Sequence, residues 1–245
     1  MAAEEHSPLD QFAITRFADL QIGGVDVSFT NASAMMLVAI VSVTLFMTLS
    51  MRRHAMVPGR WQLLAELSYE FVAKTVRDNI GSEGKRYFPL IFTLFMFILF
   101  SNMLGLIPHS FTVTSHIIVT FVLAACIFIG ATILGFVRHG FRFFTFFLPP
   151  GVPIFLAPLL VPIELVSYLS RPVSLSVRLA ANMLAGHTML AVFAGFVVAL
   201  GVFGVAPFIF IILLYGLETL VAFLQAYVFA VLTCIYIGDS IHLHH

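Results

Sequence analysis

The feature that most constrains this chain is a set of long segments without a single charged side chain. No Asp, Glu, Lys or Arg occurs in residues 87–137, 179–217 or 219–238. Soluble domains contain about 25% charged residues, whereas this chain of 245 residues contains 10% and has a mean hydropathy of +1.05. Since about 20 mainly apolar residues cross a bilayer as a helix, we predict an all-α polytopic membrane protein.

The basic residues give this protein an orientation. Seven of its twelve Lys and Arg lie in residues 52–86, and the positive-inside rule places such a loop in the cytoplasm. We therefore expect the N-terminus outside, the C-terminus in the cytoplasm, and no cleaved signal segment. Five regions are predicted: an outer N-terminal segment, 1–32; a first transmembrane helix, 33–51; a cytoplasmic amphipathic region, 52–86; a transmembrane hairpin, 87–137; and two long helices, 138–245.

Residues 61–80 have the pattern of an amphipathic helix. Glu66, Glu70, Lys74 and Arg77 gather on one side of a helical wheel, and apolar residues cover the rest. The segment is too polar to span a bilayer, so we expect it at the membrane interface or packed on a partner.

The last two apolar stretches, 154–200 and 208–238, are too long to stand upright in a membrane. As helices they measure about 70 Å and about 45 Å, against a hydrocarbon core of about 30 Å. We expect about five membrane-embedded helices, of which the last two tilt strongly, or bend at Pro162 and Pro172.

Polar side chains interrupt these two stretches, and each is a candidate functional residue because a charge inside a bilayer is costly. They are Glu164, Arg171, Arg178, Asn182, His187, Glu218 and Gln225. A spacing of seven places Glu164, Arg171 and Arg178 near one helical face, and it does the same for Glu218 and Gln225. His187 lies about 180° around the helix from Arg178.

A structural interpretation stays open for all of these residues. Ion pairs, core histidines, interhelical hydrogen bonds and side chains that reach the aqueous boundary all occur in membrane proteins. Arg178 and Glu218 would form an ion pair, and His187 would be a core histidine. Asn182 and Gln225 would form interhelical hydrogen bonds, and Glu164 and Arg171 would reach the aqueous boundary.

The functional interpretation is an interrupted proton path. A guanidinium does not deprotonate in a protein, so Arg178 cannot relay a proton and acts instead as a fixed charge. His187 and Glu218 can both gain and lose a proton. Together they indicate a route that does not run straight through, with the arginine as its insulator.

Other classes of function find little support. The formal net charge is zero, so no global field indicates nucleic acid. We predict no metal site and no cofactor, since Cys126 and Cys234 lie in separate apolar segments and the terminal HLHH is expected to be a solvated tail. An intramembrane hydrolase lacks a nucleophile with its base. A secondary proton-coupled transporter remains the alternative, although no internal repeat favours it.

Three stretches carry a resemblance to a known family. They are PIELVSYLSRPVSLSVRLAANMLAGH (162–187), ETLVAFLQAYVFAVLTCIYIGDSIHLHH (218–245) and SNMLGLIPHSFTVTSH (101–116). The chain resembles subunit a of the F-type ATP synthase, the stator half of a rotary proton channel. The histidine at 187 and the acid at 218 follow the mitochondrial arrangement, since many bacterial members have these two residue types exchanged. This hints at an alphaproteobacterial source.

The resemblance implies a role for each candidate residue. Arg178 would face the carboxylate of the rotating c-ring, His187, Glu218, Asn182 and Gln225 would belong to the inlet half-channel, and Glu164 and Ser174 to the outlet half-channel. The implied partners are the c-ring, a peripheral stalk of b or b/b′ subunits, the F1 sector indirectly, and the lipid of a bacterial inner membrane. The chain would contribute to ATP synthesis without chemistry of its own.

Overall fold

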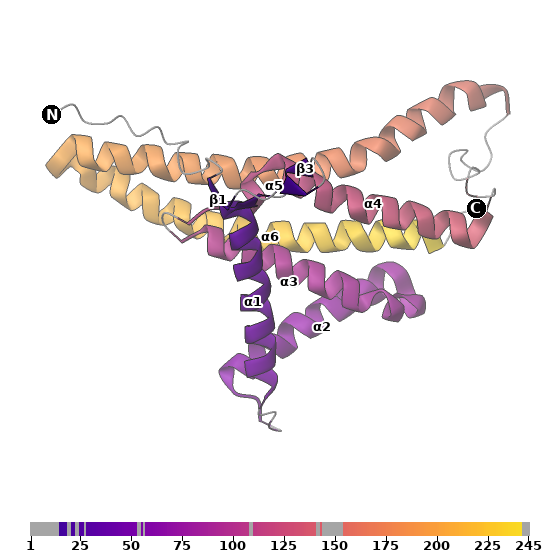
Figure 1. Cartoon of the computed structure of the whole chain (residues 1–245), viewed down its shortest axis with the longest axis horizontal. Coiled ribbons are helices and arrows are strands. Elements are labelled where there is room, and N and C mark those ends of the chain that lie inside the picture. Colours follow the sequence, from indigo (N-terminus) through magenta and orange to yellow (C-terminus); the bar gives the residue numbers. More distant parts are fainter. Residues whose placement is uncertain are drawn as a thin grey trace. The chain divides into compact units, whose positions relative to one another are not determined.

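The computed structural model describes residues 15–18, 21–22, 25–26, 28–52, 55, 57–107, 110–140, 143 and 154–241. These residues form six α-helices: α1 (Asn31–Met51), α2 (Arg60–Ile80), α3 (Phe88–Gly105), α4 (Ile117–His139), α5 (Ala157–Leu200) and α6 (Val205–Ile241) (Figure 1). Short 3-10 segments cover 81–86, 113–115, 154–156 and 201–204. The HLHH tail and most of segment 1–32 lie outside the described residues.

Five of these helices are long and apolar enough to cross a membrane: α1, α3, α4, α5 and α6. The one remaining helix in the described ranges is the amphipathic α2. The prediction of an all-α polytopic membrane protein is therefore confirmed. Within the predicted hairpin, 87–137, α3 ends at Gly105 and α4 begins at Ile117, and the described residues between them include a 3-10 segment at 113–115.

Short strands precede α1, which the sequence did not predict. Strand β1 (Arg16–Ala18) pairs antiparallel with β4 (Phe29–Thr30), and β2 (Gln21–Ile22) pairs with β3 (Val25–Asp26). Helix α1 then begins with a capping box between Thr30 and Ser33. This box satisfies backbone donors that would otherwise be unpaired at the helix start.

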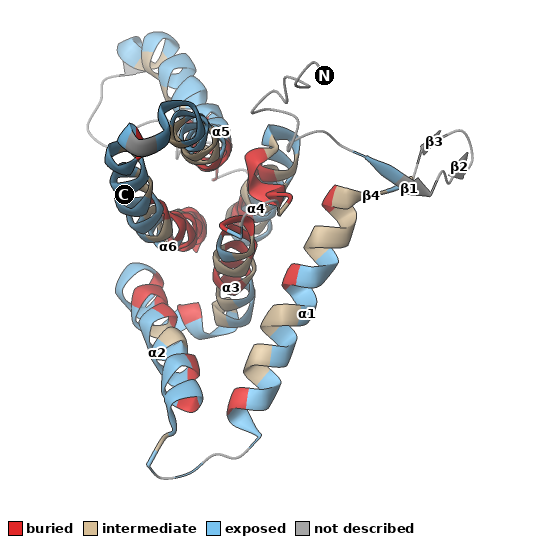
Figure 2. Cartoon of the chain, turned by 90° about the vertical axis from the view of Figure 1, so that its left-hand side faces the viewer, coloured by how far each residue is buried: buried red, intermediate tan, exposed pale blue. Residues whose placement is uncertain are grey.

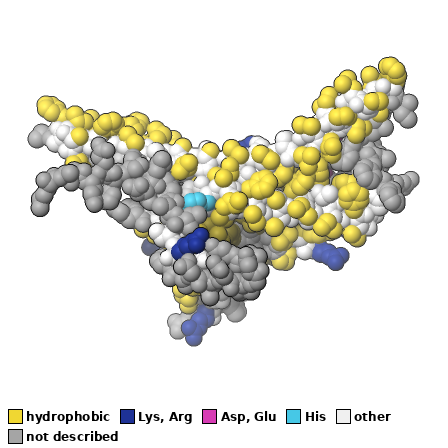
Figure 3. All heavy atoms as spheres, turned by 45° about the horizontal axis from the view of Figure 1, so that its top comes forward, with side chains coloured by type: hydrophobic (Ala, Val, Ile, Leu, Met, Phe, Trp, Pro, Cys, Tyr) yellow, Lys and Arg dark blue, Asp and Glu magenta, His cyan; other side chains and the backbone are white. Residues whose placement is uncertain are grey.

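The surface of α1 is what a lipid-facing helix requires. Its residues are mostly exposed or intermediate, with burial only at Ala32, Ala39 and Ser50 (Figure 2). A helix that is apolar all round and exposed is unstable in water but stable in hydrocarbon. On the face drawn in Figure 3, hydrophobic side chains likewise cover most of the described surface.

The helices α5 and α6 are continuous over 44 and 37 residues. At 1.5 Å per residue they are about 66 Å and about 56 Å long, roughly twice the thickness of a hydrocarbon core. Pro162 and Pro172 lie inside α5 without ending it. Between the two helices, Gly201 adopts a φ of 53°, which favours glycine.

The chain divides into two compact units, each built from portions of several helices. The first unit comprises 1–65, 96–116 and 179–226, and the second comprises 66–95, 117–178 and 227–245. Fully buried side chains form a core in each. Those of the first unit include Met96, Ile98, Asn102, Thr112, Leu179 and Met183, and those of the second include Val72, Ile91, Phe95, Phe229 and Thr233.

The amphipathic helix α2 follows its predicted polar pattern. The charged residues predicted on its polar side, Glu66, Glu70, Lys74 and Arg77, are exposed, and Val72 and Val76 are buried. In the second unit, the Phe71 ring packs on the rings of Phe95 and Tyr227, with centroids 5.8 Å and 5.1 Å away. Leu64 and Leu67 remain half-exposed, so part of the apolar side of α2 is left for lipid or a partner.

Candidate functional site

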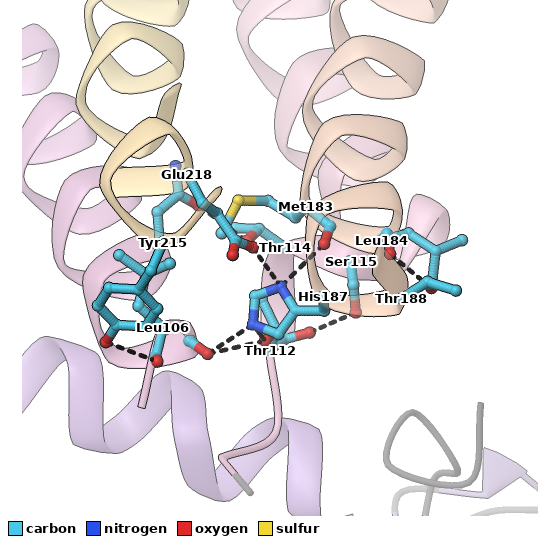
Figure 4. A network of polar contacts seen from close by, with 12 residues as sticks. Leu106, Thr112, Thr114, Ser115, Met183, Leu184, His187, Thr188, Tyr215 and Glu218 are labelled. Carbon is cyan, nitrogen blue, oxygen red and sulfur yellow. Dashed lines mark hydrogen bonds and ion pairs between the residues drawn. The ribbon is translucent and has the colours of Figure 1, made fainter. Parts of the chain in front are cut away.

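His187 lies at the centre of a polar network in the first unit (Figure 4). Its Nε2 is 2.7 Å from the carbonyl oxygen of Gly105 and 3.1 Å from Thr112 Oγ1. Its Nδ1 is 2.9 Å from the carbonyl oxygen of Met183 and 2.7 Å from Glu218 Oε1. Carbonyl oxygens only accept hydrogen bonds, so a doubly protonated ring suits this set of contacts.

Glu218 is the ion-pair partner of His187 on α6. Its side chain is 4% exposed, and neither carboxylate oxygen accepts a hydrogen bond from any residue that the structure describes. Buried polar atoms normally have such partners. The ion pair with His187 is therefore the contact among the described residues that offsets the burial of this carboxylate.

The backbone of α5 makes room for this carboxylate at Gly186. A Cβ added there would lie 2.6 Å from Glu218 Oε1, closer than real Cβ atoms approach other heavy atoms. A glycine is therefore needed at position 186, because a side chain there would displace the Glu218 carboxylate from His187.

An open groove borders Glu218. Its volume is about 210 Å³, and it is lined by Asn182, Ala185, Gly186, Met189, Leu214, Leu217, Glu218 and Val221. Asn182 is exposed. The groove is large enough for several water molecules, so it offers a path between the buried carboxylate and the exposed side of α5.

A second layer of polar contacts supports the histidine, and sequence reasoning missed it. Asn102 Nδ2 donates to the carbonyl of Ala222 at 3.1 Å, and Thr114 Oγ1 donates to Asn102 Oδ1 at 2.8 Å. The hydroxyl of Tyr215 donates to the carbonyl of Leu106 at 3.0 Å. The available signal was a concentration of Asn, Ser and Thr at 101–116.

Arg178 belongs to the second unit, where its side chain is exposed on α5. Ser174 and Val177 beside it are exposed as well. The guanidinium forms no ion pair with the described residues of its own unit. Glu218 belongs to the other unit, so an ion pair between Arg178 and Glu218 stays an open interpretation.

Arg171 is held differently from Arg178, although the two are seven residues apart. Its Nη1 is 3.1 Å from Asp239 Oδ2 on α6, within the second unit. The rings of Tyr168 and Tyr236 lie 5.5 Å and 5.7 Å from its guanidinium carbon, within the range of cation–π contacts. The arginine is therefore paired inside the protein, and the sequence did not identify its partner.

The remaining candidates take separate positions. The structure brings His187 and Glu218 into contact, and it places Asn182 on the groove that Glu218 lines. Gln225 is buried on α6, Glu164 is half-buried, and Ser174 is exposed.

Among the described residues, no three His, Cys, Asp or Glu side chains come together as a metal site would require.

Comparison with known proteins gives consistent matches. The family model described as ATP synthase A chain matches residues 33–238. The chain is 55% identical over 241 residues to the ATP synthase subunit a of Pelagibacter ubique, covering 98% of this chain and 99% of that protein. It is 56% identical over 240 residues to the protein of the same name from Rhodospirillum rubrum, covering 98% and 100%. Against that of Parvibaculum lavamentivorans the identity is 56% over 245 residues, covering 97% and 94%.

Proposed function

Since the chain belongs to the ATP synthase A chain family, and thus to the proton-translocating membrane sector of that complex, we propose how it conducts protons. Two half-channels that do not join each open to one side of the membrane. Between them a proton rides on a carboxylate of the rotating c-ring. The observation that carries this proposal is the buried His187–Glu218 pair at the edge of a groove.

The inlet half-channel uses that pair. A proton arriving from the outer side passes between His187 and Glu218, then along the groove beside Asn182 to a ring carboxylate. Gln225, buried on α6, contributes a neutral polar group to the same route. Both side chains can carry a proton, and Nδ1 and Oε1 lie 2.7 Å apart, within reach for transfer once the N–H points to the carboxylate.

Arg178 is the gate in this proposal. It is permanently charged, and its exposed position on α5 leaves it accessible to a rotor. A ring carboxylate that has lost its proton is attracted to the guanidinium and passes it as an anion. The fixed positive charge meanwhile repels protons, so the two half-channels are not short-circuited.

The outlet half-channel involves Glu164 and Ser174 on the N-terminal part of α5. A protonated ring carboxylate is neutral and can travel through lipid, where a charged one is costly. It releases its proton toward the cytoplasm near Glu164. Each 100 mV of membrane potential supplies about 2.3 kcal/mol per proton moved.

The proposed assembly follows from this mechanism. The ring of c subunits lies against the exposed Arg178 face, and b or b/b′ subunits form a peripheral stalk, for which the exposed apolar residues of α2 offer a contact surface. The chain lies in the inner membrane with its N-terminus outside and its C-terminus in the cytoplasm. The F1 sector contacts it indirectly.

Replacement of Arg178 tests the proposal. In the whole complex reconstituted in liposomes, Arg178→Ala should abolish ATP synthesis driven by a proton gradient, while the soluble sector still hydrolyses ATP. The control is Arg138→Ala, which removes an arginine that is paired with Glu83 and is outside the proposed channel. Synthesis at the control level in the Arg178 variant would contradict the gate. Solute transport by the purified chain alone would support a secondary transporter instead.

A further inference from the structure

The link between α3 and α4 approaches the proton-transfer pair closely. We propose that Thr112 and the carbonyl of Gly105 are positioning groups for His187: they keep a proton on Nε2 and leave Nδ1 as the nitrogen that exchanges with Glu218. This inference rests on the proposed function of the His187–Glu218 pair. It adds two groups on a third segment of the chain and assigns different roles to the two ring nitrogens.

The contacts at Nε2 determine its protonation. The Gly105 carbonyl, 2.7 Å away, can only accept a hydrogen bond. Thr112 Oγ1 lies 3.1 Å from Nε2 and 3.4 Å from the same carbonyl. If the hydroxyl directs its own hydrogen toward the carbonyl, its lone pair faces the ring. Both neighbours then act as acceptors, and Nε2 satisfies them only when it carries hydrogen.

The exchange therefore takes place at Nδ1. In the forward step the Nδ1–H bond breaks and an O–H bond forms on Glu218 Oε1, 2.7 Å away. The imidazolium becomes a neutral imidazole that retains hydrogen on Nε2, and the carboxylate becomes a carboxylic acid. The Met183 carbonyl, 2.9 Å from Nδ1, favours return of a proton to that nitrogen, because a carbonyl oxygen can accept from a protonated Nδ1 but cannot donate to a bare one.

Residues 110–116 of the link are held firmly enough to act as a fixed support. Asn102 and Thr112 are fully buried, and Ser115 Oγ donates to the carbonyl of Thr112 at 2.7 Å. Asn102 ties the link to α6 through its contacts with Thr114 and Ala222. A buried network with its partners satisfied stabilises one arrangement of its members.

Gly105 is required for this approach. A Cβ at position 105 would lie 2.6 Å from Thr112 Cγ2 and 2.9 Å from Thr112 Oγ1. Helix α3 ends at this glycine, so its last carbonyl is not used by the helix and can accept from His187. The end of α3 and the buried threonine thus form one acceptor site.

Two substitutions separate positioning from packing. Thr112→Val keeps the shape and removes the hydroxyl, whereas Thr112→Ser keeps the hydroxyl and removes a methyl group. In membranes that carry the whole membrane sector, passive proton flux through Thr112→Val should fall by about tenfold, since the hydroxyl contacts a charged ring. Its dependence on outer pH should also differ from the wild type. Thr112→Ser should retain at least about half of the flux, with the wild-type pH profile.

A double variant localises the effect to the histidine. In a His187→Gln background, Thr112→Val should cause no further loss, because the group that it positions is absent. If His187→Gln leaves flux unchanged, the proposed inlet itself fails. If His187→Gln abolishes flux while Thr112→Val matches the wild type, or if Thr112→Ser is as defective as Thr112→Val, only the positioning role is overturned.

A measurement on the unmodified protein does not depend on how the variants fold. With ¹⁵N-labelled histidine in the assembled complex, Nε2 of His187 should keep the chemical shift of a protonated nitrogen across the range in which flux varies with pH. Nδ1 should change over that range. A deprotonated Nε2 at any pH that supports flux would overturn the inference.

Discussion

In the described residues of each unit an ion pair joins α5 to α6, and the two pairs differ in chemistry. His187 and Glu218 in the first unit have side chains that are 10% and 4% exposed. Arg171 and Asp239 in the second unit have side chains that are 27% and 26% exposed. The more deeply buried pair is composed of two groups that titrate, whereas the other includes a guanidinium that does not.

The surroundings of the two pairs also differ, in the size of the adjoining cavity and in the hydrogen bonds that each acid accepts. Glu218 borders an open groove of about 210 Å³, and its oxygens accept no hydrogen bond from the described residues. Arg171 donates to Asp239 and lies near two tyrosine rings, beside a cavity of only about 10 Å³. In the proposed mechanism the first pair exchanges protons with water, while the second joins segments of α5 and α6 within its own unit.

The largest expected difference between the pairs concerns loss of the acid. Glu218→Gln preserves shape but cannot titrate, and it should lower gradient-driven ATP synthesis by on the order of a hundredfold or more, as loss of a general acid–base group does. Asp239→Asn makes the matching change in the second pair and should leave more than about half of the activity, since no transfer passes through it. Equal loss in the two variants, at equal amounts of assembled complex, would remove the distinction.

The second prediction exchanges the members of the titratable pair. The double variant His187→Glu with Glu218→His should retain more gradient-driven synthesis than either single variant. Each single change leaves two like groups at 2.7 Å, whereas the exchange restores one acid and one imidazole. Synthesis rates in reconstituted liposomes measure this, and a double variant no better than the singles would show that position matters more than the pair.

Gly186 provides a smaller and more local test. Gly186→Ala places a methyl group against Glu218 Oε1, which should displace the carboxylate from His187 and lower synthesis about threefold to tenfold, as misplacement of a reacting group does. The matched control is Gly195→Ala on the same helix, where an added Cβ meets nothing within 4 Å. A normal rate in Gly186→Ala would show that the close contact at Oε1 is not needed.

Much of the fold and part of the site were predictable from the sequence, for a common physical reason. Hydrocarbon excludes charge, so apolar runs identify the spans, and a charge within such a run stands out. Arg178, His187 and Glu218 were identified on that basis. Helix ends were predicted less accurately: the hairpin was placed at 87–137, and only the structure shows that α3 ends at Gly105 and α4 begins at Ile117.

The groups that were missed have ordinary sequence patterns. Thr112 and Asn102 resemble turn residues at the end of a span, and only the fold shows that one contacts His187 and the other ties the link to α6. Asp239 was expected just beyond the last membrane helix, because the predicted apolar stretch ended at residue 238. Its pairing with Arg171 depends on a contact 68 residues away in sequence, which spacing alone does not reveal.

The smallest expected effect concerns His116, a histidine outside both pairs. It directly precedes α4, and its ring stacks on Phe111 with centroids 4.8 Å apart. Burial lowers the pKa of His116. In the pH range between this lowered pKa and the ordinary imidazole pKa, the unfolded link binds more protons than the native link, so the native link loses stability as pH falls.

His116→Gln should remove part of this pH dependence. In the assembled complex, hydrogen exchange of amides 110–116, corrected for intrinsic rates, should accelerate between pH 7.5 and pH 5.5 in the wild type and change less in His116→Gln. The control His139→Gln, at the end of α4, should behave as the wild type does. An equal response in all three proteins would show that pH acts on this link, which also carries Thr112, through a group other than His116.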